Sequence, residues 1–484
     1  MKNNTSAPFA ALVPDLNKVP PDIRHVHLMG ICGVGMASLA GILKDRGYGV
    51  TGSDQNIYPP MSHFLENLSI PLIEGYHAKN LRPVPDLVII GNVITKENPE
   101  AVELSRLGIP YLSMPQALRI FAMKGAKSIV ICGTHGKTTT SALAAWALEE
   151  AGMDPGFMIG GIPNNFQRNF KVGGGPYFVV EGDEYDTAFF DKGPKFLHYS
   201  PWIVILTSIE FDHADIYRDL GHLLESFRKL IRLIPSKGLL IANGDAPVIL
   251  EEAKRAKCPV ITYGFSQGVD WRATNTMTRE NFTTTRVLKG QTEYMTLSTP
   301  LYGNHNISNL LSIVVLSDHL KVNSAVFSGA MKTFTGIKRR QEIKGEKRGI
   351  LIMDDFAHHP TAVRETIAAV KGKYVDHRLL AVFEPRSNSS RRNVFQKEYA
   401  GSFDKADLTF IPAPSLMEKI PEADRFSSSR LVEDLKKRGL KAFYSPNTDH
   451  LLTAIIREAR AGDVVLIMSN GSFDHLHDRL LEKL

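Results

Sequence analysis

Cysteine is scarce in this chain, and its scarcity excludes several kinds of protein. The 484 residues include 3 cysteines, an odd and small number that argues against a disulfide framework and favours a reducing compartment. No Cys/His spacing matches a zinc site. Cys32 and Cys132 each fall in a glycine-rich loop, where we interpret them as small residues tolerated in tight turns.

Long apolar runs are also missing. No run reaches the ~20 residues that cross a bilayer, and the N-terminal segment has no charged stretch followed by an apolar one, as a secretory signal would. We therefore expect a soluble, cytoplasmic protein without membrane insertion. Residues 1–21 are expected to form a flexible extension.

A strong charge of one sign is missing as well. The formal net charge is +6, and 43% hydrophobic with 22% charged residues is an ordinary globular mixture. The dense basic runs, Lys338–Arg340 and Arg391–Arg392, lie beside motifs described below. Phosphate-bearing small substrates explain such local charge at least as well as nucleic acid does, and we expect no nucleic-acid partner.

Three segments each restart the strand–loop–helix rhythm of α/β domains. They begin at HVHLMG, SIVICGTHGKTTT and GILIMDDFAHHPTAV, and the predicted domains are residues 22–125, 126–336 and 337–484. We predict Rossmann-like first and third domains and a central phosphate-loop domain with a mostly parallel sheet. Within the central domain, the Thr-rich alternation of residues 270–300 predicts antiparallel strands, and NHNISNLLSIVVLSDHL predicts a helix.

The segment IVICGTHGKTTT, residues 129–140, predicts a phosphate loop. A buried strand enters a glycine turn that opens a helix, so that backbone N–H groups can surround phosphate oxygens. Lys137 would reach the β and γ phosphates, and the Thr138 hydroxyl would bind Mg²⁺. The loop is shorter than the general pattern, because Ile131 stands where that pattern has its first glycine.

Acidic side chains follow two further predicted strands. YFVVEGDEYD supplies Glu181, Asp183, Glu184 and Asp186, and WIVILTSIEFDHADIY supplies Glu210, Asp212, His213 and Asp215. We expect these strands to be adjacent, so that carboxylates and an imidazole at their C-terminal ends hold Mg²⁺ against phosphates. Solvated strand ends are the alternative for any single residue.

An earlier glycine loop, GICGVGM, differs from the dinucleotide fingerprint because its spacing is G-x-x-G-x-G. Asp54, at the end of the next predicted strand, stands where a ribose-binding acid would be. The loop indicates a nucleotide or diphosphate at a helix N-terminus, and a packing turn without a ligand is the alternative.

Taken together, these motifs resemble the Mur ligases from about His25 to the C-terminus. The blocks GICGVGM, TGSD, GTHGKTTT, EFDHADI, NHN, RRQE and DDFAHHPTAV stand in the order that the family uses. The blocks SDQNIYPPMS, GDEYDTAFFDK, FEPRSN and MSNGSF resemble the branch that attaches a tripeptide more than the branch that attaches L-alanine.

The resemblance implies an ATP-dependent, Mg²⁺-requiring ligase of peptidoglycan recycling. It would join UDP-N-acetylmuramate, through an acyl-phosphate, to the murein tripeptide L-alanyl-γ-D-glutamyl-meso-diaminopimelate. L-Alanine as the amine substrate, in peptidoglycan biosynthesis, is the alternative. A folylpolyglutamate synthetase-like enzyme should lack the first domain, a nicotinamide dehydrogenase would not use the phosphate loop, and a nucleotide-binding switch would not need the third domain.

The same resemblance assigns residues to roles. Catalysis is assigned to Lys137, Glu181 and His213, and metal ligation to Thr138, Glu181 and His213. ATP binding is assigned to Gly133, Thr134, His135, Gly136, Lys137, Thr138, Thr139, Asn306, Arg339, Arg340, Asp354 and Asp355, with the choice within Arg339/Arg340 and Asp354/Asp355 left open. UDP-sugar binding is assigned to Gly30, Gly33, Gly35, Met36, Ser53, Asp54 and Asn92. Peptide binding is assigned to Arg386, Ser387 and Asn388.

Two features of the chemistry stay open in the sequence. The carbamylated lysine of several Mur ligases is not carried over, because Lys229 stands too far beyond His213. A base must deprotonate the attacking amine, and His358 and His359 are candidates by position. A polar loop and helix cap is the alternative for this His-His-Pro sequence.

Overall fold

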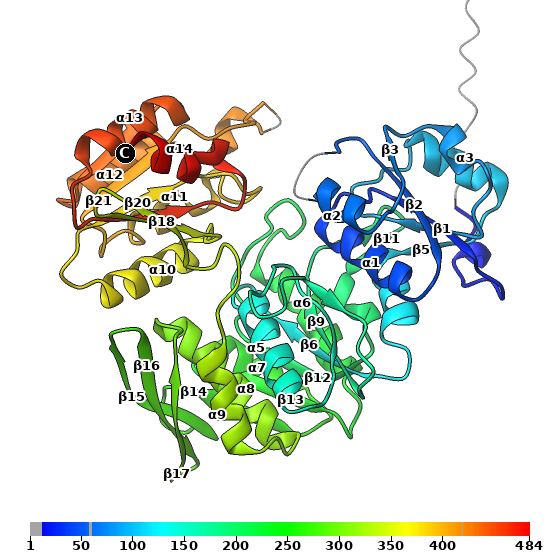
Figure 1. Ribbon diagram of the computed structural model, residues 1–484, viewed down its shortest axis with the longest axis horizontal. Helices are drawn as coiled ribbons and strands as arrows, with labels where there is room; N and C mark the ends of the chain where they lie inside the picture. The colour runs from blue at the N-terminus through cyan, green and yellow to red at the C-terminus, as the bar shows by residue number, and fades with distance from the viewer. Residues whose placement is uncertain (1–11, 58–60, 419) are drawn as a thin grey trace, which may run out of the picture.

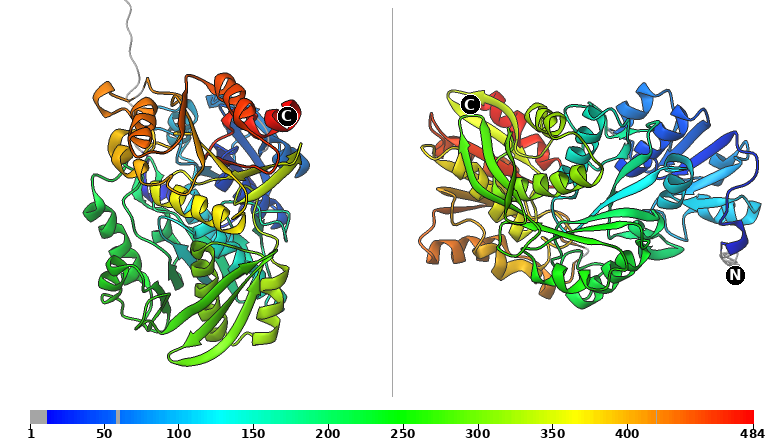
Figure 2. Two further views of the ribbon diagram at one scale, coloured as in Figure 1. Left: turned by 90° about the vertical axis from the view of Figure 1, so that its left-hand side faces the viewer. Right: turned by 90° about the horizontal axis from the view of Figure 1, so that it is seen from below.

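The chain folds into three α/β domains, each built around its own sheet (Figure 1). The structure, a computed structural model, describes residues 12–57, 61–418 and 420–484. The first domain (blue) and the third (yellow to red) lie on either side of the central domain, and the view from below in Figure 2 shows the same order. The predicted three-domain α/β architecture is confirmed, and the boundaries drawn from sequence stay predictions.

The first domain has a 5-stranded parallel sheet in the order β3-β2-β1-β4-β5. Its strands are β1 His25–Met29, β2 Gly49–Asp54, β3 Leu72–Glu74, β4 Leu87–Ile90 and β5 Tyr111–Ser113. Its helices are α1 Val34–Asp45, α2 Met61–Asn67, α3 Pro99–Leu107 and α4 Met114–Ala117, with short turns at Pro14–Leu16, Ala78–Leu81 and Leu118–Ala122. The inner strands β1 and β4 are almost wholly buried, which explains their continuous apolar sequences.

The first domain contacts the segment that precedes it and the central domain. Residues 1–11 of the expected extension lie outside the described residues, but Asn17 donates to Tyr111 O (3.0 Å) and accepts from Gln116 Nε2 (2.8 Å). At the other end, α1 packs on the central domain so closely that a Cβ on Gly41 would lie 2.4 Å from Phe170. The first two domains therefore share packed apolar surface.

The central domain has a 10-stranded sheet in the order β17-β16-β15-β14-β13-β12-β6-β9-β7-β8. The strands are β6 Lys127–Cys132, β7 Gly156–Met158, β8 Phe170–Lys171, β9 Tyr177–Gly182, β12 Pro201–Leu206, β13 Leu239–Asn243, β14 Val260–Gly264, β15 Trp271–Arg279, β16 Phe282–Lys289 and β17 Thr292–Thr299. A separate hairpin pairs β10 Asp186–Ala188 with β11 Asp191–Pro194. The helices are α5 Lys137–Glu150, α6 Leu220–Leu233, α7 Pro247–Ala253, α8 Asn304–His319 and α9 Ser324–Thr333, with a short turn at Lys195–His198.

Two predictions for this domain are confirmed and one is wrong. Strands β15, β16 and β17 pair antiparallel, and NHNISNLLSIVVLSDH forms α8. The strands that carry the acidic residues, β9 and β12, are not adjacent, because the phosphate-loop strand β6 lies between them and pairs in parallel with both. The acidic strand ends therefore flank the phosphate loop on both sides, an order that depends on crossovers between strands far apart in the sequence.

The third domain has a 6-stranded sheet in the order β18-β19-β23-β20-β21-β22. The strands are β18 Glu342–Lys347, β19 Ile350–Asp355, β20 Leu379–Phe383, β21 Leu408–Pro412, β22 Ala442–Ser445 and β23 Val464–Met468. The helices are α10 Pro360–Lys373, α11 Gln396–Ala400, α12 Ser428–Lys437, α13 Thr448–Glu458 and α14 Leu476–Lys483, with short turns at Asn393–Phe395, Glu422–Asp424 and Phe473–His475. All pairs are parallel except β18 with β19. No helix of the described ranges is both long and apolar enough to cross a membrane.

Candidate active site

Two glycines close the loop between β6 and α5. Gly133 has φ +138° and Gly136 has φ +82°, conformations that strain any residue with a Cβ. A Cβ on Gly133 would lie 2.3 Å from Thr207 Oγ1, and one on Gly136 would lie 2.5 Å from Asn309 Oδ1. The loop therefore depends on glycine at both positions.

The backbone amides of this loop divide into two sets. Thr134 N donates to Ser208 O (3.1 Å) and His135 N donates to Ser208 Oγ (2.8 Å), so both are used inside the protein. The first helical bond of α5 starts at Thr140 N. The amides of residues 137–139 precede it and have no acceptor within the helix, so they form the kind of N-terminal site that binds phosphate.

Lys137 is held by a carboxylate that the sequence-based assignment did not select. Its Nζ donates to Glu184 Oε2 (2.9 Å) and to Gly133 O (2.6 Å), and Glu184 Oε1 also pairs with His213 Nε2 (3.0 Å). Burial would lower the pKa of Lys137, but the charges of Glu184 and Asp183 outweigh burial and raise the pKa. Lys137 is thus a positive charge fixed at the mouth of the phosphate loop.

Glu181, the carboxylate that the sequence did select, lies against Thr138. Thr138 Oγ1 donates to Glu181 Oε2 (3.2 Å), and Gly160 N donates to Glu181 Oε1 (2.6 Å). Burial raises the pKa of Glu181, while the Gly160 bond and the Lys137 charge act in the opposite direction. A partly buried carboxylate with a raised pKa is stabilised in its ionised form by a nearby cation. The hydroxyl of Thr138 and the carboxylates of Glu181 and Glu184 are oxygen ligands that fit Mg²⁺, and His213 joins this set through Glu184.

The structure separates the two arginines between which the sequence could not choose. Arg340 Nη2 reaches Thr138 Oγ1 across the domain boundary (3.3 Å). Arg339, whose φ is +63°, turns the other way and donates to Asp354 Oδ2 (3.2 Å), Ser469 O (2.8 Å) and Gly471 O (2.7 Å) within the third domain. Arg340 is therefore the arginine that points at the phosphate loop.

Asn306 is buried in a cluster of polar groups where the central and third domains meet. Its Nδ2 donates to Tyr302 O (3.0 Å) and Gln341 Oε1 (3.2 Å). Within the described parts of the chain, three buried polar atoms nearby have no hydrogen-bond partner: the Tyr302 hydroxyl, His305 Nδ1 and Gln341 Nε2. Buried polar atoms normally have partners, so these three atoms are candidates for contacts with a bound ligand, and the adenine contact of Asn306 stays a prediction.

Asp355 bonds to two backbone amides beside this polar cluster. Its Oδ2 accepts from Gln341 N and its Oδ1 from Ala357 N, both at 2.8 Å. Burial raises the pKa of Asp355 even though Arg340 opposes the change. Asp355 thus shapes the loop around Gln341, whereas Asp354 pairs with Arg339. Direct contacts of either carboxylate with ribose stay predictions.

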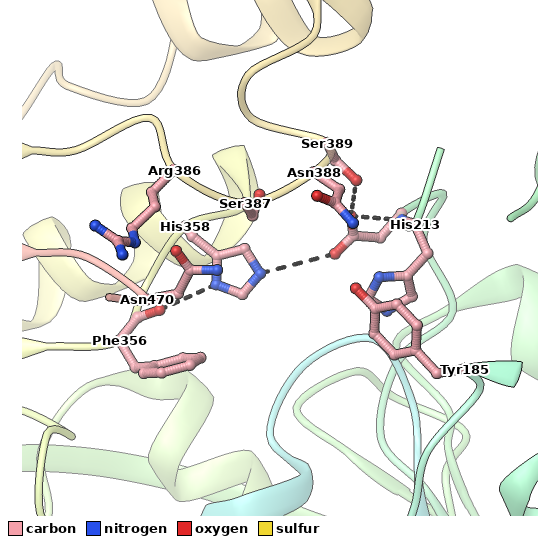
Figure 3. Close-up of a pocket in the computed structure, with 10 residues that line it drawn as sticks. Tyr185, His213, Phe356, His358, Arg386, Ser387, Asn388, Ser389 and Asn470 are labelled. Carbon is pink, nitrogen blue, oxygen red and sulfur yellow. Dashed lines mark hydrogen bonds and ion pairs between the residues drawn. The ribbon is translucent and has the colours of Figure 1, made fainter. Parts of the chain in front are cut away.

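A cavity of about 360 Å³ opens between the central and third domains (Figure 3). It is lined by Tyr185, Asp212, His213, Phe356, His358, Arg386, Ser387, Asn388, Ser389 and Asn470. All three residues predicted to bind peptide are among these. Arg386 Nη1 donates to Glu384 Oε1 (3.4 Å), and the Arg386 side chain lies so close to Gly471 that a Cβ there would be 2.0 Å from its Nε.

The β12–α6 loop, residues 207–219, connects this cavity to the phosphate loop. Ser389 Oγ donates to Asp212 Oδ1 (2.6 Å) and Asn388 Nδ2 donates to Asp215 Oδ2 (2.8 Å), each from the third domain to the central one. Burial would raise the pKa of Asp212, but nearby histidines outweigh burial and lower the pKa. Asp212 is therefore an ionised wall of the cavity.

The two histidines of the His-His-Pro sequence have different environments. His358 lines the cavity, with Nδ1 3.0 Å from Phe356 O and Nε2 4.0 Å from Asp212 Oδ2, as Figure 3 shows. His359 is 6% exposed and caps α10, because its Nδ1 accepts from Thr361 N (3.3 Å). The cap interpretation thus holds for His359, and His358 is the histidine available to a substrate.

The glycine loop of the first domain is held by Asp54. Asp54 Oδ2 accepts from Cys32 N (2.9 Å), and Gly30, at φ +79°, donates its N–H to Ser53 O (2.8 Å). Gly33 is the N-cap of α1, so the helix N-terminus faces the loop as the sequence suggested. The aspartate fixes the loop that a diphosphate would approach.

The other residues assigned to the UDP-sugar lie around this loop with different exposures. The Ser53 hydroxyl points into the domain and donates to the buried Glu100 Oε2 (2.6 Å). Met36 is buried, a Cβ on Gly35 would lie 3.3 Å from Met114 Cε, and Asn92 is exposed in the turn after β4. The roles of all these residues in sugar binding stay predictions.

Sequence reasoning missed some residues of this region. Glu184 was named among the strand-end acids but Glu181 was preferred, and Tyr185 and Asn470 of the cavity were not assigned. The available signals were the EGDEYD and MSNGSF blocks, which contain all three. Neither block reveals which side chain points inward.

Comparisons with known proteins agree with this geometry. Residues 25–125 match the model described as Mur ligase family, catalytic domain; residues 131–317 match the Mur ligase middle domain; and residues 339–471 match the Mur ligase, glutamate ligase domain. The chain belongs to the Mur ligase family. Members of this family are ATP-dependent ligases that form amide bonds, which excludes the dehydrogenase and the non-catalytic switch.

Relatives match nearly the whole chain. The UDP-N-acetylmuramate–L-alanyl-gamma-D-glutamyl-meso-2,6-diaminoheptandioate ligase of Escherichia coli is 39% identical over 461 residues, covering 95% of this chain and 98% of the relative. The UDP-N-acetylmuramate–L-alanine ligase of Desulforamulus reducens is 32% identical over 463 residues, covering 95% and 98%. The crystal structure of a murein peptide ligase from Psychrobacter arcticus superposes with a TM-score of 0.69 at 34% identity, covering 95% of this chain and 98% of that one.

Proposed function

We propose that this protein joins the carboxylate of UDP-N-acetylmuramate to the amine of L-alanyl-γ-D-glutamyl-meso-diaminopimelate, with ATP converted to ADP and phosphate. The observation that carries the proposal is the difference in identity between two branches of one family. The tripeptide ligase of Escherichia coli is 39% identical and the L-alanine ligase of Desulforamulus reducens is 32% identical, over almost the same length. The names of both relatives share UDP-N-acetylmuramate and differ in the amine substrate, so the higher identity to the tripeptide ligase favours the tripeptide.

The phosphate loop supports activation of the carboxylate by ATP. A carboxylate does not react with an amine until it is converted to a better acylating group, and transfer of the γ-phosphoryl group to it supplies an acyl-phosphate. The amides of residues 137–139, Lys137 and Arg340 would surround the transferred group and stabilise its negative charge. Mg²⁺ held by Thr138, Glu181, Glu184 and His213 would supply further neutralisation of phosphate charge.

The cavity of Figure 3 supports a peptide amine substrate. Arg386 is 34% exposed and uses one terminal nitrogen on Glu384. Its other donors form no hydrogen bond with the described residues and can bind a carboxylate, for which the guanidinium fork is suited. Asn470 Oδ1 is buried and has no hydrogen-bond partner among the described residues. A donor on the substrate, such as an amide or ammonium group, would satisfy it.

His358 is the group in this cavity best suited to accept the amine proton. Its Nδ1–H donates to Phe356 O, which leaves the Nε2 lone pair facing Asp212. Burial lowers the pKa of His358 although Asp212 opposes the change, so the imidazole is neutral near pH 7 and can act as a base. Once protonated, it would be stabilised by the Asp212 carboxylate, 4.0 Å away.

The test is phosphate release from ATP with Mg²⁺ and UDP-N-acetylmuramate, with either the tripeptide or L-alanine added. We expect release that depends on the tripeptide, together with a UDP-muramyl-tripeptide product identified by mass. Release with L-alanine alone would move the protein to the biosynthetic branch while keeping the ATP chemistry. No phosphate release with either amine would refute the proposed substrate pair.

A further inference from the structure

Three side chains outside the Mg²⁺ set meet beside the phosphate loop. His135 belongs to the loop, Glu210 follows β12, and His359 comes from the third domain. Each offers one ligand atom, and these atoms all lie within 4.8 Å of one another. Glu210 Oε2 is 3.4 Å from His135 Nε2 and 3.6 Å from His359 Nδ1. The group combines two imidazoles and one carboxylate.

The protonation of His359 leaves a lone pair on Nδ1, the nitrogen that lies 3.6 Å from Glu210 Oε2. Its Nε2 lies 3.2 Å from Phe211 O, and because a carbonyl oxygen can only accept, Nε2 carries the hydrogen and Nδ1 is the acceptor. A histidine that binds a metal commonly donates its other ring N–H to a carbonyl in this way. The contact from Thr361 N to Nδ1 is long, at 3.3 Å, so a stronger ligand could replace it.

The other two ligand atoms are also prepared for binding. His135 Nε2 is buried, and its contact with Glu210 Oε2, at 3.4 Å, is an ion pair that does not have hydrogen-bond geometry, although buried polar atoms normally form a hydrogen bond. Glu210 Oε2 accepts from Thr361 Oγ1 at 2.6 Å, which orients the carboxylate.

The backbones behind these side chains are fixed. The Thr134 hydroxyl accepts from Glu210 N (2.9 Å) and donates to Glu210 O (3.0 Å). The Thr207 hydroxyl donates to His135 O (2.5 Å). A site held by such supporting bonds costs little to organise. Glu210 is 37% exposed, so an ion can enter from solvent.

We propose that His135, Glu210 and His359 bind a divalent first-row transition-metal ion of the Zn²⁺ class, at a site distinct from that of Mg²⁺. Two imidazole nitrogens with one carboxylate suit Zn²⁺ and its neighbours, whereas Mg²⁺ prefers oxygen ligands. Three protein ligands leave a coordination position for water or a substrate oxygen. Because His359 is the only one of the three from the third domain, a bound ion would tie that domain to the phosphate loop.

The test is titration of the full-length protein with Zn²⁺, without nucleotide and with Mg²⁺ in excess, followed by calorimetry. We expect one Zn²⁺ site per chain whose dissociation constant rises at least tenfold in His359→Gln and in Glu210→Gln. The controls are Glu251→Gln, which alters a surface carboxylate, and His477→Gln, which removes a histidine outside the cluster. Both should bind as the unaltered protein does. Circular dichroism checks each fold, and if His359→Gln does not fold, Glu210→Gln carries the test.

A further variant, His213→Gln, distinguishes Zn²⁺ binding at the proposed site from binding at the Mg²⁺ site. If Zn²⁺ binding is lost in His213→Gln and unchanged in Glu210→Gln, the ion occupies the Mg²⁺ set and the proposal is wrong. Unchanged binding in both cluster variants, or no Zn²⁺ site in the unaltered protein, overturns it equally. As a second readout, Co²⁺ should give a visible absorption spectrum of nitrogen ligation that disappears in His359→Gln.

Discussion

Glu184→Gln tests the carboxylate that holds Lys137 of the phosphate loop from the end of β9. The glutamine keeps the size of the side chain but loses its charge. Glu184 is 1% exposed and holds both Lys137 Nζ (2.9 Å) and His213 Nε2 (3.0 Å). Lys137 is itself only 15% exposed, so water cannot readily replace the lost partner.

The expected loss of stability follows from these two bonds. A hydrogen bond to a charged group contributes about 1.5–3 kcal/mol and a neutral one about 0.5–1.5 kcal/mol. Weakening both bonds should therefore cost about 2–3 kcal/mol, less than the ~3–5 kcal/mol for breaking a buried ion pair outright, because Asp183 still offsets the Lys137 charge. For a domain of this size that corresponds to a fall in Tm of about 4–12 °C.

The pH dependence of this loss has a definite sign. Burial would raise the pKa of Glu184, but Lys137 and His213 outweigh burial and lower the pKa below its ordinary value of 4.5. A group whose pKa is lower in the folded state contributes stability above its unfolded pKa and loses it as the pH falls through the folded value. The difference between the two proteins should thus be full at pH 7 and shrink below about pH 4.

Thermal unfolding without ligands, followed at pH 7 and at lower pH, measures both effects. The matched control is Glu251→Gln, whose carboxylate pairs with Lys254 on the surface, where the two side chains are 61% and 71% exposed, and which should change Tm little. In the ligase assay, loss of Lys137 positioning should lower kcat by on the order of 10²-fold. Equal Tm values for the two variants, or a Tm difference that does not depend on pH, would refute the reasoning.

Three further predictions test other parts of the site. Arg386→Ala should raise the KM for the tripeptide about 10–100-fold, the equivalent of one charge-assisted contact, while the KM for ATP stays constant. Steady-state kinetics measures both constants, and an equal rise in both would contradict the assignment of Arg386 to the peptide. Gly133→Ala should cost about 3 kcal/mol of stability and weaken ATP binding, because φ is +138° and the new Cβ would lie 2.3 Å from Thr207 Oγ1; unchanged calorimetric affinity for ATP would exclude this. Asp183 pairs with Lys195 at 2.6 Å, and its pKa is lowered to about 2 because Lys195 outweighs burial. Its ionised carboxylate therefore contributes up to about 2 kcal/mol to the free energy of unfolding, and this contribution is lost as the pH falls from about 4 to about 2. Asp183→Asn should remove that loss from the acid unfolding profile.

Local sequence predicted the parts of this fold that depend on neighbouring residues. The phosphate loop, α8 and the antiparallel strands β15–β17 all follow from patterns within a few tens of residues. The order β9-β6-β12 does not, because it depends on which strands a crossover brings together. Strand β18 was also missed, since EIKGEK is largely polar and forms a partly exposed edge.

The candidate site divides in the same way. Glu181 and Glu184 stand three residues apart where β9 ends, and whether a side chain points at Lys137 or at Thr138 depends on the turn beyond the strand. Arg339 and Arg340 differ because Arg339 adopts a left-handed φ of +63°, a conformation that the sequence RRQE does not reveal. Contacts between domains need three-dimensional packing that no local pattern encodes.

The concentration of bonds on the β12–α6 loop has a consequence for turnover. Several hydrogen bonds from the third domain end on residues 210–215, and this short segment also carries His213. Separation of the two domains must exchange all of them for bonds to water within one movement, at about 1 kcal/mol each. The bonds that oppose separation of the domains thus lie beside the residues of the active site, and we expect release of the finished product to require their exchange for bonds to water.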